Sequence, residues 1–230
     1  MNGLAAVVFD IDDTLYLERD YVRSGFGVVS RAIAPDAGAP PLSVFETLWG
    51  LFESGARGDH FDSLLREYPE AASRWSVRDL VALYRGHEPD IALLPHMEPL
   101  LDELKGRGAS LAIVSDGNLA SQVAKVTALG LDRWFEEICL TDAWGRDYWK
   151  PSTRAFRHVA ATLGAEPPNL VYVADNPHKD FLAPLHLGWG VTRLRLPGQL
   201  HVEVNCENVP EASSVEQLSD YLLAHSGPGL

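Results

Sequence analysis

The sequence predicts an α/β fold in which a doubly wound parallel sheet is interrupted by an inserted all-helical domain. Three observations favour it: short apolar segments rich in β-branched residues, helical patterns between them, and a long stretch that contains helical patterns alone. Strands that alternate with helices form right-handed crossovers, and these place helices on both faces of a parallel sheet.

The strands are predicted at residues 4–9, 110–114, 170–174 and 190–196, with a weaker one at 137–140. The first three are almost uniformly apolar instead of alternating, as expected of strands that are covered on both faces. The predicted core is therefore a Rossmann-like sheet with its strands buried.

The helices between these strands are predicted from apolar residues that recur at helical spacing. The three apolar sets are Leu100, Leu101 and Leu104; Val123, Val126 and Leu129; and Phe156, Val159, Ala160 and Leu163. Near the C-terminus, Ser213 and Glu216 have the spacing of a capping box, which predicts one final helix.

The inserted domain is predicted to contain helices near 19–33, 43–54, 59–67 and 76–85. We expect residues 17–94 to form a helical cap domain over the carboxyl ends of the strands, and residues 1–16 and 95–230 to form the core. Substrate selection would then depend on the cap and its hinges, with these candidate contacts: Tyr16, Arg19, Tyr21, Arg23 and Trp49.

Composition and charge exclude several classes of partner. The net charge of −13 disfavours nucleic acid or an anionic membrane surface as the main partner. No signal peptide is recognisable, and no apolar run approaches the roughly 20 residues that a membrane span needs. Two cysteines are too few for a secreted disulfide scaffold, so we expect a cytoplasmic protein, either a monomer or a homodimer.

Polar residues follow the predicted strands where ligands bind in open α/β sheets, beyond the carboxyl ends. Asp10 and Asp12 follow the first predicted strand, Ser115 ends the second, and Asp175 follows the strand at 170–174. Lys150 lies in the sequence between Ser115 and Asp175. Two carboxylates about 4 Å apart repel each other by roughly 4 kcal/mol at an effective dielectric of about 20. A cation or a retained proton is therefore expected among these acids.

These segments resemble the motifs of the haloacid dehalogenase superfamily. The segment "DIDDTL" at 10–15 is similar to the first motif, and Ser115 to the second. Lys150 before Pro151 is similar to the third motif, and Asp175 with Asp180 to the fourth. The insertion between the first and second motifs implies the helical-cap subclass.

The resemblance implies specific roles for these residues. Asp10 matches the nucleophile that forms an aspartyl-phosphate, and Asp12 matches the general acid and base. Mg²⁺ would be held by Asp10, by the backbone carbonyl of Asp12 and by Asp175, because it prefers oxygen ligands. Ser115 and Lys150 match residues that bind the phosphoryl group, together with the backbone amides of Asp116 and Gly117.

Supporting roles are expected for four further acids and hydroxyls. Asp180 would lie behind the metal ligands, acting through water or by holding Lys150. Thr14 would either donate a hydrogen bond to Asp10 or only shape the turn. Asp13 is expected to bind loop amides, and the carboxylate of Asp116 is expected to turn outward from the phosphate site.

The function that the resemblance implies is Mg²⁺-dependent hydrolysis of a small phosphomonoester metabolite through an aspartyl-phosphate. A phosphomutase of a sugar phosphate uses the same motifs and is an alternative, and a non-catalytic phospho-ligand-binding protein is a weaker one. A dehalogenase is disfavoured because the dehalogenases of this superfamily do not keep an acid at the position of Asp12. A two-component receiver domain is disfavoured because Lys150 precedes Asp175.

Overall fold

The computed structural model describes residues 5–56 and 58–225. The chain divides into two compact units, one made of the chain up to Arg19 together with the chain from Ala92 onward, the other of Asp20–Ile91. These borders lie three residues from the borders predicted after residues 16 and 94. The first unit is called the core unit and the second the helical unit.

The core unit is built on one six-stranded sheet of strand order β3-β2-β1-β4-β5-β6, in which all neighbours are parallel. The strands are β1 (Ala6–Phe9), β2 (Ser110–Ser115), β3 (Glu137–Leu140), β4 (Leu170–Ala174), β5 (Gly190–Leu194) and β6 (Glu211–Ala212). The predicted α/β fold is confirmed, and β6 is a short addition at the edge. The strand order reverses on either side of β1, which is where a ligand crevice forms in such sheets.

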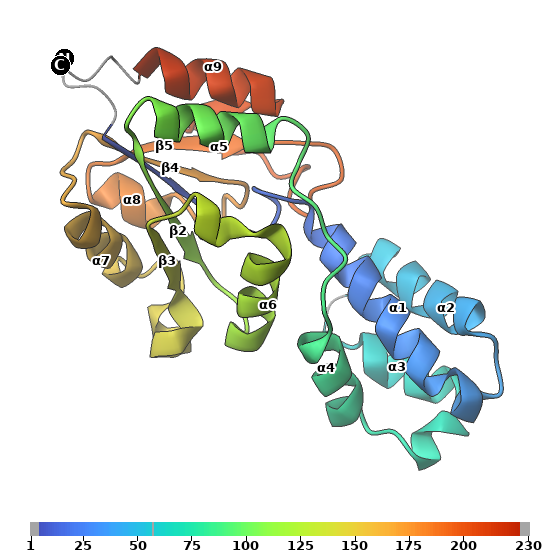
Figure 1. Ribbon diagram of the computed structural model, residues 1–230. Helices are drawn as coiled ribbons and strands as arrows, with labels where there is room; N and C mark the ends of the chain where they lie inside the picture. The colour runs from blue at the N-terminus through green and yellow to red at the C-terminus, as the bar shows by residue number, and fades with distance from the viewer. Residues whose placement is uncertain (1–4, 57, 226–230) are drawn as a thin grey trace. The chain divides into compact units, whose positions relative to one another are not determined.

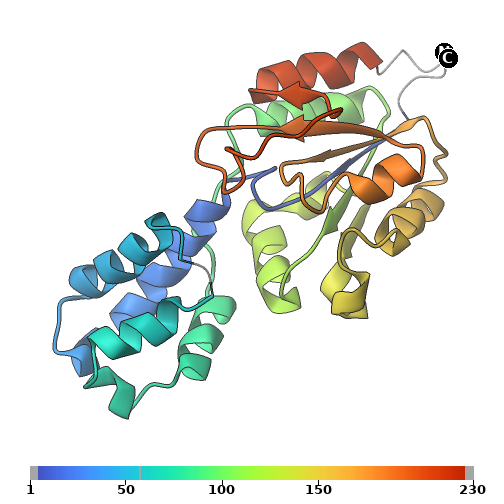
Figure 2. The ribbon, with the colours of Figure 1, turned by 180° about the vertical axis from the view of Figure 1, so that it is seen from behind.

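Helices cover both faces of this sheet. The core helices are α5 (Met97–Gly106), α6 (Leu119–Leu129), α7 (Arg154–Leu163), α8 (Leu182–His186) and α9 (Val215–His225). Figure 1 shows α5 and α9 side by side on one face, with α7 and α8 on the other, and Figure 2 shows the same layers from behind. Under α7, Phe156 packs edge-on against Tyr172 and Trp189, with ring centroids 4.9 and 5.5 Å apart.

Two predictions about the core helices are wrong in detail. The backbone N–H of Gln217 donates to Ser214 Oγ, and the Gln217 side chain accepts from the backbone of Ser213. The side chains of Ser214 and Gln217 therefore bind the N-terminal backbone of α9, in place of the predicted capping box of Ser213 and Glu216. Val123 was predicted to be part of the apolar face of α6, but it is 49% exposed. The buried face of α6 carries polar side chains beside the predicted Val126 and Leu129, as described below.

The helical unit contains the helices α1 (Glu18–Ala37, which begins in the core unit), α2 (Pro41–Glu53), α3 (His60–Glu67) and α4 (Val77–Gly86). Each corresponds to a predicted helix, although α1 runs four residues past its predicted end, to Ala37. Aromatic rings fill the interior, and the rings of Tyr21 and Tyr84 are 5.5 Å apart. Tyr21, a candidate substrate contact, therefore belongs to the interior of this unit.

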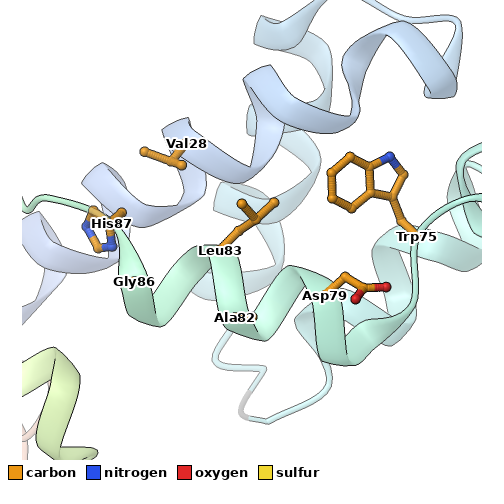
Figure 3. A pocket seen from close by; sticks show the side chains of 7 residues that line it. All are labelled: Val28, Trp75, Asp79, Ala82, Leu83, Gly86 and His87. Atoms are coloured by element: carbon orange, nitrogen blue, oxygen red, sulfur yellow. The ribbon is translucent and has the colours of Figure 1, made fainter.

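The helical unit also has a groove of about 450 Å³ (Figure 3). It is lined by Val28, Trp75, Asp79, Ala82, Leu83, Gly86 and His87. Its carboxylate, Asp79, already accepts hydrogen bonds from Ser76 as part of the cap of α4. Among residues 5–56 and 58–225, no helix is long and apolar enough to cross a membrane.

Candidate active site

The predicted site residues converge at the carboxyl ends of the central strands. Asp10 follows β1, Ser115 ends β2 and Asp175 follows β4. The parallel register pairs Phe9 with both Ile113 and Val173, so the three strand ends lie at the same edge of the sheet. All three side chains are buried although they are polar. Burial of that kind requires partners for every polar atom.

Three carboxylates form a group that fits a metal ion. Oxygen atoms of Asp10, Asp175 and Asp180 lie within 4.8 Å of one another, and all three residues are buried. Burial raises the pKa of Asp175 to about 10, and the nearby charges of Asp180, Asp13 and Asp10 act in the same direction. Asp175 Oδ2 has no hydrogen-bond partner among the residues that the structure describes. A hard divalent cation would satisfy that oxygen and relieve the repulsion.

Lys150 lies beside these carboxylates and is buried with them. Its ammonium nitrogen is 2.9 Å from Asp10 Oδ2, 2.8 Å from Asp180 Oδ1 and 2.9 Å from the hydroxyl of Tyr172. Two carboxylate oxygens and one hydroxyl therefore surround the ammonium group. Burial alone would lower the pKa of Lys150, but Asp10 and Asp180 outweigh it and hold that pKa well above its ordinary value.

Tyr172 is a site residue that the sequence analysis missed. It lies in β4, is fully buried, and donates its hydroxyl to the backbone carbonyl of Val114 at 3.1 Å. A tyrosine in the middle of an otherwise apolar strand was the available signal, because a buried hydroxyl usually has a hydrogen-bond partner.

The prediction for the carboxylate of Asp116 is wrong, because it turns inward and is buried. It accepts a hydrogen bond from Thr141 Oγ1 at 2.6 Å, and both of its oxygens are 3.1 Å from the backbone nitrogen of Lys150. Lys179 Nζ lies 3.6 Å from the same carboxylate. Several buried donors therefore hold the charge in place. Asp116 connects the end of β2 to the segment that carries Lys150.

The neighbours of Asp116 leave donors for a ligand. Ser115 Oγ is buried and has no hydrogen-bond partner within the described part of the chain. Gly117 has φ +133, and a Cβ there would lie 2.4 Å from Nε2 of Gln122. A side chain at this position would therefore displace Gln122 as well as restrict the approach of a phosphate.

The carboxylate of Asp12 is bound by side chains of α6. Lys125 Nζ is 2.6 Å from Asp12 Oδ1, and Gln122 Nε2 donates to Oδ2 at 2.8 Å. The hydroxyl of Tyr16 also donates to Oδ1. Burial acts to raise the pKa of Asp12, but Lys125 and these hydrogen bonds lower it below its ordinary value.

Gln122 and Lys125 were also missed by the sequence analysis. They lie three residues apart on the buried face of α6, next to Val126 and Leu129. Residues at that spacing share one side of a helix, so two polar residues on an apolar face were the signal that could have identified them.

Asp13 has the predicted structural role. Its carboxylate accepts from the backbone nitrogens of Glu18 and Leu200, each at 2.7 Å. Burial raises the pKa of Asp13 to about 6. Of the two roles expected for Thr14, the hydrogen bond to Asp10 is not formed, since Thr14 Oγ1 has no partner among the described residues. Thr14 instead belongs to the turn, and its backbone nitrogen donates to the carbonyl of Ile11.

A buried arginine supports the segment that carries Asp175. Arg193 in β5 is completely buried and donates from Nε to the backbone carbonyl of Asp175 at 2.9 Å. It also pairs with Glu211 at 2.8 Å. Arg193 lies within a predicted strand, and a charged residue at such a position indicates a buried charge whose donors all need hydrogen-bond partners.

Comparisons with known proteins agree with this arrangement. Residues 4–188 match the haloacid dehalogenase-like hydrolase family. A glyceraldehyde 3-phosphate phosphatase from Methanothermobacter thermautotrophicus is 30% identical, over 95% of this chain and 100% of its own. The phosphatase of the same name from Methanopyrus kandleri is 29% identical over 90% of this chain and 91% of its own. A phosphoserine phosphatase from Thermus thermophilus is 28% identical over 64% of this chain and 61% of its own.

Solved structures share the fold. A haloacid dehalogenase-type hydrolase from Bacillus subtilis, crystallised with magnesium, superposes with a TM-score of 0.63 at 18% identity, covering 96% of this chain and 99% of its own. A phosphatase of the same type from Thermococcus onnurineus has a TM-score of 0.62 at 20% identity, again covering 96% and 99%. The family match extends from the first strand to α8 and includes all the residues that converge at the strand ends. This chain belongs to the haloacid dehalogenase-like hydrolases.

Proposed function

We propose that the protein is a Mg²⁺-dependent phosphatase that hydrolyses a small phosphomonoester through an aspartyl-phosphate on Asp10. The observation that carries the proposal is a group of three buried carboxylates in which Lys150 pairs with Asp10 and Asp180, while Asp175 Oδ2 has no hydrogen-bond partner among the described residues. Phosphoryl transfer needs concentrated positive charge next to an anionic nucleophile, and these residues can provide it.

The donor set fits Mg²⁺. The carboxylates of Asp10 and Asp175 and the backbone carbonyl of Asp12 would hold the ion, because it prefers oxygen ligands and keeps some of its waters. Asp180 pairs with Lys150 and lies close enough to the same group to act on it through water. When bound, Mg²⁺ would offset the charge of the carboxylates and of the transferring phosphoryl group.

The nucleophile in this proposal is the Asp10 carboxylate. Its Oδ1 accepts from the backbone nitrogen of Ile11 at 2.9 Å, and its Oδ2 forms an ion pair with Lys150 Nζ at 2.9 Å. These contacts fix the orientation of the carboxylate before substrate arrives, which lowers the entropic cost of reaching the reactive geometry.

Ser115 and the backbone amides of Asp116 and Gly117 would bind the phosphoryl oxygens, and Lys150 would contribute its charge. The Ser115 hydroxyl supports this role because it is buried and has no hydrogen-bond partner among the described residues. Asp12 would protonate the leaving oxygen and later accept the proton of the attacking water.

The substrate class is inferred from the relatives. Two of the matching proteins described above act, by name, on glyceraldehyde 3-phosphate and one on phosphoserine. We therefore infer that this chain also acts on a short phosphorylated metabolite, and glyceraldehyde 3-phosphate and phosphoserine are the first compounds to test.

The test is an assay of phosphate release from these two compounds, with sugar phosphates and nucleotides as comparison, in Mg²⁺ and in EDTA. We expect release with Mg²⁺, none in EDTA and none from Asp10→Asn. Isomerisation of a sugar phosphate without phosphate release would support the phosphomutase alternative. Binding of phosphorylated compounds without any turnover would support a non-catalytic binding protein.

A further inference from the structure

The carboxylate of Asp12 is held more firmly than a solvated acid in a loop would be. Both of its oxygens are engaged, Oδ1 by Lys125 and Tyr16 and Oδ2 by Gln122. Two of these three partners come from one face of α6, a helix far from Asp12 in the sequence. This set of contacts fixes both the position and the rotation of the carboxylate.

Gln122 connects this carboxylate to the predicted phosphate-binding turn. Its Nε2 donates both to Asp12 Oδ2 at 2.8 Å and to the backbone carbonyl of Asp116 at 2.9 Å. The side chain passes over Gly117, where any Cβ would collide with it at 2.4 Å. The first and second motifs are therefore held at a fixed separation by one amide.

Lys125 contributes a charge where apolar packing alone would favour an apolar residue. Its side chain is 5% exposed and pairs with a carboxylate that is 18% exposed. Burial of an ammonium group carries a large desolvation cost, so an ion pair of this kind is weak evidence for a role in stability. A role in orienting Asp12 accounts for both the burial and the pairing.

We propose that Gln122 and Lys125 are positioning residues that direct the Asp12 carboxyl toward the leaving oxygen of the substrate. The proposal rests on the phosphatase function proposed above. In the first step, which starts with Asp12 protonated, a bond forms between Asp10 and phosphorus and the bond from phosphorus to the leaving oxygen breaks. The Asp12 proton moves to that oxygen, which leaves the carboxylate that Lys125 and Gln122 bind. In the second step water attacks phosphorus, its proton moves to Asp12, and the bond to Asp10 breaks.

The test uses the dependence of the rate on the leaving group. An alkyl phosphate such as glycerol phosphate requires a proton for its leaving oxygen, whereas 2,4-dinitrophenyl phosphate has a leaving group that departs without one. In Lys125→Met and Gln122→Met we expect kcat/KM to fall by about 100-fold for the alkyl phosphate and by less than about threefold for the aryl phosphate, since positioned acids typically contribute such factors. Lys105→Met is the matched control, because Lys105 is an exposed lysine of the same unit whose ammonium binds the carbonyl of Arg133.

A second readout concerns the hydrolysis step, in which Asp12 acts as the base. Both variants should release dinitrophenol in a rapid burst of about one equivalent per enzyme, followed by slow turnover. Formation of the aspartyl-phosphate stays fast with this leaving group, whereas its hydrolysis, which uses Asp12 as the base, becomes slow. Circular dichroism and unfolding in urea identify a variant that fails to fold, and the other variant then carries the test.

The outcomes separate this inference from the proposed function. If wild type hydrolyses neither phosphate in Mg²⁺, the phosphatase proposal fails. If wild type is active but both variants lose the same factor on both substrates, the residues have only a structural role and the inference is wrong. An unchanged or raised kcat/KM for the alkyl phosphate in the folded variants would also overturn it.

Discussion

The ammonium group of Lys150 lies 2.8 Å from Asp180 Oδ1, and neither side chain is exposed to solvent. Lys150 also contacts Asp10 at 2.9 Å, so one cation serves two acids. Charges of this kind remain ionised inside a protein only when they are paired and fully bonded. The same contacts that stabilise Lys150 place it next to the proposed nucleophile.

Replacement of Lys150 by Met should damage both the fold and the activity. Loss of one partner leaves buried acids uncompensated, so the free energy of unfolding in EDTA should fall by about 3–5 kcal/mol. Loss of the positive charge should lower kcat by about 100-fold or more. Urea unfolding and steady-state kinetics measure the two effects.

The control for Lys150→Met is Lys105→Met, which removes an exposed lysine. It should change the free energy of unfolding by less than about 0.5 kcal/mol, as surface substitutions do. A Lys150→Met protein as stable and active as this control would contradict the role of the buried pair.

The stability of the metal-free protein should fall as the pH rises. Burial raises the pKa of Asp175 to about 10, and burial raises that of Asp13 to about 6. Between about pH 4 and pH 10 the folded state therefore holds protons that the unfolded state has released, so a higher pH favours unfolding. Urea unfolding in EDTA should show a lower free energy at about pH 8 than at about pH 6.

Mg²⁺ should reverse this trend, because it binds ionised carboxylates and its affinity rises as they lose protons. Its stabilising effect should be larger at about pH 8 than at about pH 6. In Asp175→Asn the stabilisation by Mg²⁺ should disappear and the pH dependence in EDTA should be weaker. Equal stabilisation of wild type and Asp175→Asn by Mg²⁺ would place the ion elsewhere.

Asp116 should be required for the position of Lys150. Asp116→Ala leaves the backbone nitrogen of Lys150 without its acceptor and removes the shorter of the two hydrogen bonds of the Thr141 hydroxyl, so the free energy of unfolding should fall by about 2 kcal/mol. Asp116→Asn keeps one acceptor oxygen and should lose less stability. Kinetics should rank kcat in the order wild type, Asp116→Asn, Asp116→Ala, and a reversed order of the two variants would refute the assignment.

Tyr172→Phe removes the hydroxyl to which Lys150 donates and keeps the ring that packs against Phe156. We expect a loss of about 1 kcal/mol in the free energy of unfolding, because the hydroxyl binds both Lys150 and the carbonyl of Val114. The kcat value should fall several-fold. Tyr148→Phe is the matched control, since Tyr148 is 36% exposed, and a similar effect in both variants would contradict the prediction.

The sequence predicts the sheet and the positions of the predicted catalytic residues because both depend on local patterns. The uniformly apolar segments of β1, β2 and β4 identify buried parallel strands, and the polar residues directly after them must lie at one edge of the sheet. That pattern predicts the placement of Asp10, Ser115 and Asp175 at this edge, whereas their expected roles come from the resemblance to the haloacid dehalogenase superfamily.

The sequence does not predict side-chain direction where the partners are distant along the chain. Asp116 was expected to point outward, yet Thr141 and Lys150 supply the donors that keep it inside. Likewise Lys125 looks like an ordinary helix lysine until α6 is packed next to Asp12. In both cases the outcome depends on which donors tertiary packing brings near a carboxylate, and periodicity carries no such information.

The most direct test of the central claim is the site of covalent labelling during turnover. The protein would be mixed with ³²P-labelled substrate and Mg²⁺, quenched in acid, reduced with borohydride and mapped by peptide mass spectrometry. The account predicts a transient phosphoryl group on Asp10, sensitive to hydroxylamine and absent from Asp10→Asn. Labelling of a different residue, or undiminished turnover by Asp10→Asn, would contradict it.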